Sequence, residues 1–423
     1  MRLSLRRTAS AALIAVLPVL ALALPAAPGA AEPRPGPPGA IPGRYIVTLK
    51  PGASPDAVLG GLGATPLFTY RHALTGFAAQ LTQAQAEKAR TAAGVDEVEQ
   101  DAMVNVPPGE DAPADSDLEP PYSGGPDGGP VDLPEETPAP LPSASALRMG
   151  GFTPWGLTRI NNRALGGTGF SVKATGAKVT AYVVDSGIEF SHPDFGGRAV
   201  PGYDAIGDGL DGGDCNGHGT HVAGTVGGSY TGVARKVSLV SVRVFPCVGR
   251  TANSVILAGI DWVAGHAKRP AVANLSFAGR WSLAVNRAVE ALSRTGVFPV
   301  VAAGNDNINA CFVSPASSPG AFTVGAIDQE DRRAWFSDWG TCVDIHAPGT
   351  GILSAYLNGS FRDMDGTSMA APHVTGIAAL YKDTYGDASF AALSAWLGEH
   401  AIRNVPLDGG FGTVRLAAFT NGL

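Results

Sequence analysis

Residues 178–187 read Lys-Val-Thr-Ala-Tyr-Val-Val-Asp-Ser-Gly, an apolar run that ends in a carboxylate. Similar apolar, β-branched runs recur at Ser238–Phe245, Val272–Phe277, Val297–Ala303 and Phe322–Ala326. Helical patterns lie between and after them, at Gly219–Gly227, Ala252–Ala267, Leu283–Thr295 and Ser368–Tyr385. Continuous apolar strands that alternate with helices predict a three-layer α/β fold, in which helices cover both faces of a parallel sheet. In such a fold, ligand sites lie at the carboxyl ends of the strands.

Four polar residues stand where this fold would bring them to that edge. Asp185 ends the first strand, and Asn305 follows the apolar run 297–303. His218 opens a helix behind Asn-Gly, and Ser368 opens the last long helix behind Gly-Thr. A serine becomes a nucleophile when a nearby histidine accepts its proton, and a carboxylate orients that histidine. The residues therefore predict acyl transfer, with the Ser368 N–H and the Asn305 side chain as donors to the oxyanion.

A metal site is the alternative use of the same segment. His218 and His221 are three residues apart, so a helix would place both on one face. That pattern alone would allow a metal-dependent hydrolase. The presence of Asp185 and Ser368 in matching contexts favours the serine mechanism, which leaves His221 as a structural, hydrogen-bonded residue.

The order of the segments Asp185-Ser-Gly, His218-Gly-Thr-His and Gly-Thr-Ser368-Met-Ala-Ala-Pro resembles the subtilisin-like serine proteases. Further segments are similar to the branch of proteinase K and aqualysin: Pro154-Trp-Gly-Leu-x-Arg-Ile160, Ser314-Pro-Ala-Ser317, Asp331-Arg-Arg333 and Phe411-Gly-Thr-Val-Arg-Leu416. The resemblance covers about residues 154–423. It implies peptide hydrolysis by a triad of Asp185, His218 and Ser368, with Asn305 as oxyanion donor.

The resemblance also implies a cleft that holds the substrate as an extended strand. One edge would lie near Gly249–Asn253, and the other would be formed by Ser276, Phe277, Ala278 and Gly279. The pocket for the residue before the scissile bond (P1) would be lined by Ala302, Ala303 and Gly304 and by Ser276–Ala278. These residues carry no charge, so we expect an apolar or aromatic P1 residue. The family commonly has Ser-Leu-Gly at the positions of Ser276, Phe277 and Ala278. The added methyl group of Ala278 would narrow the pocket, so we expect the largest P1 side chains to be disfavoured.

A structural calcium ion is a further implication of the resemblance. In the proteinase K branch, one ion binds two backbone carbonyls and a carboxylate. The matching positions here are Pro319, Ala321 and Asp344. Oxygen donors on loops suit Ca²⁺. An ordinary loop carboxylate is the alternative role for Asp344.

The chain has four cysteines, Cys215, Cys247, Cys311 and Cys342. An even number in an exported chain suggests two disulfides, with three possible connectivities. Free buried thiols are the alternative, and a zinc site is disfavoured because no Cys-x-x-Cys spacing occurs. The resemblance to the aqualysin type supports the pairs Cys215–Cys247 and Cys311–Cys342.

The N-terminal third has a different organisation. Residues 1–31 have a basic start and a short apolar run, which is typical of a secretory signal rather than of a membrane anchor. Residues 44–106 predict the order βαββαβ, with a capping box at Thr82 and Gln85, and resemble the family's inhibitory propeptide. Such a small unit is only marginally stable by itself. Residues 107–147 hold nine acids, no base and many prolines, which predicts an extended linker.

Charge gives little indication of a partner outside that linker. The chain has 37 acidic and 30 basic residues, so nine acids fewer would leave it near neutrality. Such a balance does not favour nucleic-acid binding.

Taken together, the motifs predict a secreted, monomeric serine endopeptidase, made as a zymogen, with its catalytic domain at 148–423 and no membrane contact after signal removal. The alternative is a binding protein of the same fold that is inactive or permanently blocked by its propeptide. An acidic linker is unusual in related precursors, which motivates this alternative.

Overall fold

The computed structural model describes residues 39–105, 153–248, 250–406, 410 and 412–423. The predicted signal 1–31, the linker 107–147 and the substrate position Gly249 lie outside these residues. No helix in the described ranges is long and apolar enough to cross a membrane.

Residues 39–105, called the propeptide unit below, have the predicted order βαββαβ. Its elements are β1 (Ala40–Leu49), α1 (Pro55–Leu62), β2 (Pro66–Tyr70), β3 (Gly76–Gln80), α2 (Gln83–Thr91) and β4 (Val95–Asn105). The predicted capping box is present, because the Thr82 side chain accepts from the Gln85 N–H and the Gln85 side chain accepts from the Thr82 N–H. The strands form an antiparallel sheet in the order β2-β3-β1-β4.

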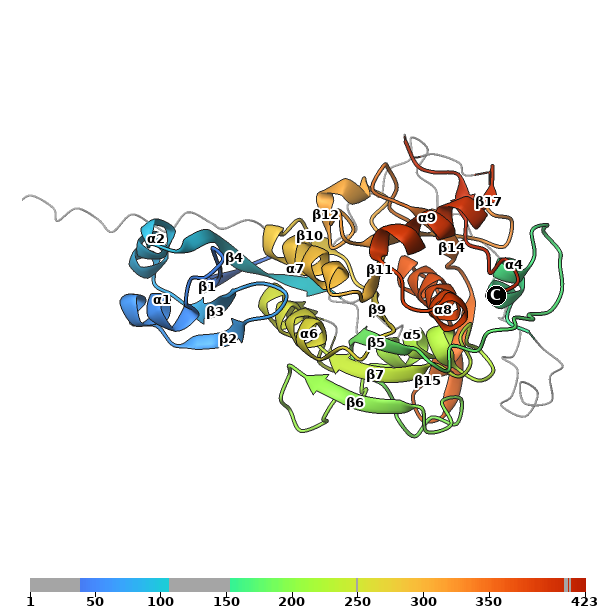
Figure 1. Cartoon of the computed structure of the whole chain (residues 1–423), viewed down its shortest axis with the longest axis horizontal. Helices are drawn as coiled ribbons and strands as arrows, with labels where there is room; N and C mark the ends of the chain where they lie inside the picture. Colours follow the sequence, from blue (N-terminus) through green and yellow to red (C-terminus); the bar gives the residue numbers. More distant parts are fainter. Residues whose placement is uncertain (1–38, 106–152, 249, 407–409, 411) are drawn as a thin grey trace, which may run out of the picture. The chain divides into compact units, whose positions relative to one another are not determined.

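The C-terminal domain, residues 153–423, is built on a nine-stranded sheet in the order β17-β18-β14-β13-β11-β9-β5-β7-β6 (Figure 1). The seven strands from β14 to β6 are parallel, as the sequence predicted. In sheet order the strands are β17 (Ile402–Arg403), β18 (Leu416–Ala417), β14 (Ile345–Pro348), β13 (Phe322–Ile327), β11 (Phe298–Ala302), β9 (Ala271–Leu275), β5 (Thr180–Asp185), β7 (Ser238–Arg243) and β6 (Ala199–Asp204).

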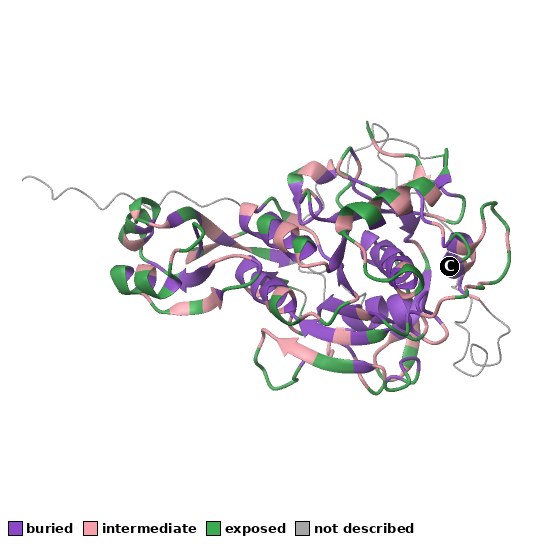
Figure 2. Cartoon of the chain, viewed as in Figure 1, coloured by how far each residue is buried: buried purple, intermediate pink, exposed green. Residues whose placement is uncertain are grey.

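Helices cover both faces of this sheet, because alternate strand residues point to opposite sides. Ala181 and Val183 of β5 join one core with α5 (His218–Gly227) and α8 (Thr367–Tyr385). Tyr182 and Val184 join a second core with α6 (Asn253–His266) and α7 (Leu283–Arg294). Figure 2 shows α8 buried along most of its length, so this helix holds its first residues firmly.

Smaller elements complete the domain. They are α4 (Trp155–Asn161), α9 (Phe390–His400), the 3₁₀ turn η1 (Ala310–Phe312), the pair β10 (Gly279–Arg280) and β12 (Val313–Ser314), the hairpin β15 (Ile352–Tyr356) and β16 (Ser360–Met364), and β8 (Arg250–Ala252). Disulfides join Cys215 to Cys247 and Cys311 to Cys342, the pairing of sequence neighbours. The first disulfide lies three residues before the start of α5.

Candidate active site

Asp185 and His218 form a buried pair at the carboxyl edge of the sheet. Asp185 ends β5, and its Oδ1 lies 2.7 Å from Nδ1 of His218 at the start of α5. Both side chains are almost completely buried. Burial lowers the pKa of His218, but the charge and hydrogen bond of Asp185, together with the charge of Asp214, raise it above the usual value. The carboxylate therefore fixes the ring with its Nε2 available as a base.

Two polar residues hold the Asp185 loop against α5, and the sequence analysis did not identify either. The Asp214 carboxylate accepts from the N–H groups of Asn216 and Gly217, and from both the N–H and the hydroxyl of Thr220. The Ser186 hydroxyl donates to Asp214 and accepts from the Gly219 N–H. Because the first N–H groups of a helix have no partner within it, these bonds fix the position where His218 emerges. The sequence Asp-x-Asn-Gly before a helix was the available signal.

Ser368 lies in the first turn of α8, behind a glycine that the backbone requires. Gly366 has φ of 145°, a conformation that disfavours any side chain. The Ser368 hydroxyl donates to the carbonyl of Ser276 at 3.1 Å, and the Ser276 hydroxyl donates back to the Ser368 carbonyl at 2.8 Å. Nε2 of His218 has no hydrogen-bond partner among the described residues. The structure thus brings Asp185 and His218 into contact, whereas the Ser368 hydroxyl is hydrogen-bonded to the Ser276 carbonyl rather than to His218.

Asn305 follows β11 and has its side-chain carbonyl anchored. Its Oδ1 accepts from the Thr367 N–H at 2.9 Å and from the Thr367 hydroxyl at 2.8 Å. Because the oxygen end of the amide is engaged, the NH₂ end is the free donor of this half-buried side chain. The Thr367 hydroxyl also accepts from the Gly304 N–H, so the residue directly before Ser368 is bound to both Gly304 and Asn305. Thr367 is a site residue that the sequence analysis missed.

His221 has a structural role in this arrangement. Its Nε2 lies 2.8 Å from the carbonyl of Ile352 and 3.0 Å from that of Arg362. Burial lowers its pKa to about 3. A neutral ring whose Nε2–H donates to two carbonyls cannot present that nitrogen to a metal ion. His221 therefore joins α5 to the β15–β16 hairpin, as the serine interpretation expected.

An extended strand of the propeptide unit lies where the sequence placed the substrate. The end of β4 pairs antiparallel with β8, with Met103 opposite Ala252 and Val104 opposite Thr251. On its other side, the Val104 side chain lies against Gly279, since a Cβ there would be 3.0 Å from the Val104 methyl. The two predicted edges thus hold one strand between them. A side chain at position 279 would crowd it.

The other residues predicted to bind substrate have mostly buried side chains, so they would contact a substrate mainly through their backbone. Phe277 is buried and packs against Phe245 in the second core, with ring centroids 5.7 Å apart. Ser276 is also buried, and its hydroxyl is engaged by the Ser368 carbonyl as described above. Ala302 and Ala303 are buried, and a Cβ at Gly304 would lie 3.6 Å from that of Ala278, so the two predicted pocket walls face each other.

The oxygen groups at the predicted calcium site could bind such an ion. Asp344 precedes β14, and its Oδ2 accepts from the Thr323 N–H at 2.7 Å. Its Oδ1 accepts no hydrogen bond from the described residues. Surrounding protein desolvates the carboxyl and raises its pKa to about 6, although the residue still reaches the surface. A cation beside the carboxylate would offset the free-energy cost of ionising this desolvated group. Pro319 and Ala321 lie directly before β13, the strand next to β14.

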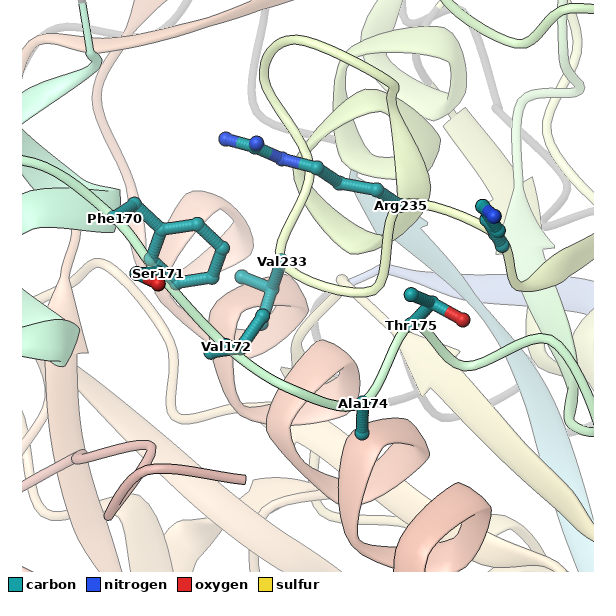
Figure 3. Close-up of a pocket in the computed structure, with 8 residues that line it drawn as sticks. Phe170, Ser171, Val172, Ala174, Thr175, Val233 and Arg235 are labelled. Carbon is teal, nitrogen blue, oxygen red and sulfur yellow. The ribbon is translucent and has the colours of Figure 1, made fainter.

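A separate pocket of about 330 Å³ contains none of the predicted site residues (Figure 3). Segment 170–175 forms one wall, and Val233, Arg235 and Lys236 form the other. The guanidinium of Arg235 lies 5.1 Å from the ring centre of Phe170. Its lining includes Ser171, Thr175 and Lys236 but no histidine or carboxylate, so it lacks the pair that activates a serine in the predicted mechanism.

Comparison with known proteins agrees with this geometry. A model of the subtilase family, Peptidase S8, matches residues 176–415, and a model of the peptidase inhibitor I9 family matches residues 44–107. The chain is 42% identical to an alkaline serine exoprotease A from Vibrio alginolyticus over 313 residues, which are 74% of this chain and 52% of that protein. It is 37% identical to a cuticle-degrading protease from Metarhizium anisopliae, over 96% of this chain and 98% of that protein.

The fold is similar to a solved structure as well. A cold-adapted subtilisin-like serine proteinase superimposes with a TM-score of 0.62 at 44% identity, over 63% of this chain and 98% of that one. The chain spans about half the length of the Vibrio relative and nearly all of the Metarhizium relative.

Proposed function

Because the chain belongs to the subtilase family and carries an inhibitor I9 unit, we propose that it is a secreted serine endopeptidase made as a zymogen. The observation that carries this proposal is the β4 strand between β8 and Gly279, beside the buried Asp185–His218 pair. A cleft that holds one extended polypeptide in this way can hold a substrate by the same backbone bonds.

In the proposed mechanism the Ser368 hydroxyl leaves the Ser276 carbonyl and attacks the carbonyl carbon of the scissile bond. His218 Nε2 takes the hydroxyl proton, while Asp185 stabilises the imidazolium. Negative charge on the tetrahedral oxygen is stabilised by the Asn305 NH₂ group and the Ser368 N–H. His218 then gives its proton to the leaving amine, and the C–N bond breaks. Water, activated by His218, hydrolyses the resulting Ser368 ester and restores the free hydroxyl.

The propeptide unit would act as an intramolecular inhibitor until it is cut away. Its last described residue, Asn105, is still paired with Arg250 on the cleft edge. A cut shortly after this residue, at about position 106, suits a strand that already lies in the substrate position. A cut near 147 would remove the acidic segment as well.

Specificity would come from a pocket without charged groups on its surface. Ala302, Ala303, Gly304 and Ala278 supply apolar walls, which suit an apolar or aromatic P1 residue. We expect the substrates to be proteins and peptides, because the cleft holds an extended polypeptide. We also propose that the protein is a monomer and that it binds one structural Ca²⁺ at Pro319, Ala321 and Asp344.

The experiment that tests this function is labelling of the secreted protein by a serine-directed phosphonate. Stoichiometric labelling of Ser368 with loss of peptide hydrolysis is the expected result. If Ser368 is not labelled and the processed protein hydrolyses no peptide, the chain is the blocked binding protein instead. The variant Ser368→Ala is the matched control, since it removes the nucleophile and little else.

A further inference from the structure

Asp338 lies directly behind the loop that carries Asn305, although it contacts neither the triad nor the cleft edges. It belongs to the connection between β13 and β14 and is completely buried. Its Oδ1 accepts from the Asp306 N–H at 3.0 Å and from the Ile308 N–H at 2.9 Å. Its own N–H donates to the Gly304 carbonyl at 2.9 Å. Asp338 therefore holds the backbone immediately before and immediately after Asn305.

The second carboxyl oxygen of Asp338 faces Gly304. Oδ2 is buried and has no hydrogen-bond partner among the described residues. Gly304 has φ of 115°, and a Cβ at this position would overlap Oδ2. Because a buried unpaired oxygen is costly, this arrangement needs a compensating benefit. Gly304 also lines the proposed P1 pocket, so the carboxyl group supports both the pocket wall and the oxyanion donor.

We propose that Asp338 is a positioning residue that holds Asn305 in the geometry required to donate to the oxyanion. The inference rests on the serine mechanism proposed above. Thr367 fixes the side chain of Asn305, and Asp338 fixes its backbone. Loss of this support shifts the amide donor relative to the developing charge. Because that donor acts mainly in the transition state, the loss appears in kcat rather than in KM.

The protonation state of Asp338 changes how firmly the loop is held. Burial raises its pKa to about 7, and the neighbouring charge of Asp306 acts in the same direction. The N–H groups of Ile308 and Asp306 and the charge of Arg333 lower it. Hydrogen bonds to an ionised acceptor are roughly twice as strong as those to a neutral one. The ionised form, which predominates above neutral pH, therefore holds the Asn305 loop more firmly.

The first test compares Asp338→Ala with Asp194→Ala on enzyme that has matured by its own processing. Asp194 is also completely buried and accepts from the N–H of Tyr230 and the hydroxyl of Thr231, away from Asn305. Active sites are counted with a stoichiometric serine-directed reagent, so kcat refers only to folded enzyme. We expect about a tenfold lower kcat with little change in KM for Asp338→Ala, and an unchanged kcat for Asp194→Ala. Equal kcat per active site in both variants would overturn the proposal.

The second test uses Asp338→Asn, which keeps the acceptor oxygen and nearly the same side-chain volume, so it leaves no cavity of the kind that the alanine variant creates. The wild-type to variant ratio of kcat cancels the titration of His218. We expect this ratio to be near one at about pH 6 and to rise to about threefold at about pH 9. A ratio that stays constant over this range contradicts the proposed role. An inactive wild-type enzyme would instead contradict the proposed function itself.

Discussion

His218 is completely buried beside a carboxylate, and its protonation determines when the nucleophile can be activated. Its pKa is lowered by burial and raised by Asp185 and Asp214, with the net shift upward. The neutral ring is the form that accepts the Ser368 proton. Activity should therefore appear only as the pH rises through this raised value.

We predict that kcat/KM rises with pH and has its midpoint above 6.5, the usual pKa of a histidine. The variant Asp185→Asn removes the counter-charge, so its midpoint should fall and its rate should drop on the order of 10⁴-fold. Peptide hydrolysis measured across the pH range on mature enzyme checks both expectations. A midpoint at or below 6.5 in the wild type would show that Asp185 does not control this histidine.

Asp338 has a predictable effect on stability. Its pKa is raised from 3.8 to about 7, so the folded protein holds this proton more tightly than the unfolded chain. Stability from this group is present below 3.8 and is lost as the pH rises towards 7. Asp338→Asn cannot ionise, so it does not lose this stability. As the pH rises from about 3.8 to about 7, the Tm of the variant should increase relative to that of the wild type. The corresponding difference in unfolding free energy should reach up to a few kcal/mol. Thermal unfolding of both proteins in the Ser368→Ala background measures this, and a pH-independent difference would contradict it.

Three carboxylates accept from backbone N–H groups across the contact between the propeptide unit and the catalytic domain, and two of them do so at helix starts. Asp101 of β4 accepts from the Ser254 N–H in the first turn of α6, where Ala252 offers no side-chain cap. Glu99 accepts from the Ala284 N–H in the first turn of α7. Asp261 of α6 accepts in turn from three consecutive N–H groups of the propeptide unit, at 71–73. Each contact pairs a carboxylate with otherwise unsatisfied N–H groups.

The variant Asp101→Asn should weaken this contact. It keeps an acceptor for Ser254 but loses the ion pair with Arg44, whose Nε lies 2.8 Å from Asp101. We expect roughly fivefold faster release of the cut propeptide, which corresponds to about 1 kcal/mol of capping and charge. The lag before full activity in freshly processed enzyme is the measurement. Asp56→Asn is the control, because its carboxylate is exposed and makes only a 3.5 Å pair with Arg71; an equal lag in both variants would rule out the effect.

The loop before β14 gives a prediction for calcium. Asp344 has its pKa raised to about 6, so below that pH protons compete with a cation for this carboxylate. A chelator should lower the Tm of the wild type at about pH 8 but much less at about pH 5, and should have no effect on Asp344→Asn. Thermal unfolding of the Ser368→Ala background shows this directly. A chelator effect that survives in Asp344→Asn would place the ion elsewhere.

Sequence patterns predicted those elements whose signal is local. The alternating strands and helices gave the parallel sheet, and the Thr82–Gln85 box marked the start of α2 within a residue. Contacts between distant segments were not predictable in the same way. Nothing in the residues around Asp338 or Asp261 indicates that their carboxylates bind backbone N–H groups 30 and 190 positions away. Such partners are determined by the folded arrangement of loops rather than by composition or periodicity.

Across the whole molecule, the propeptide unit depends on the catalytic domain for part of its core. Val47 and Phe77 pack within the unit, whereas Ile46, Tyr70 and Val104 join the core formed by α6 and α7. The Tyr70 hydroxyl also donates to the Ser254 carbonyl. This shared core explains how a unit too small for much stability of its own is folded here, and why cutting the chain need not release it at once.

Self-maturation by Ser368 is tested most directly by the intact mass of the secreted wild-type and Ser368→Ala proteins, measured side by side. We predict that the wild type ends as a fragment beginning near residue 107 or near 148, and that Ser368→Ala keeps the propeptide covalently attached. The mass also locates the cut relative to the acidic segment. Identical trimming of both proteins, or no trimming of either, would contradict the claim that Ser368 performs its own maturation.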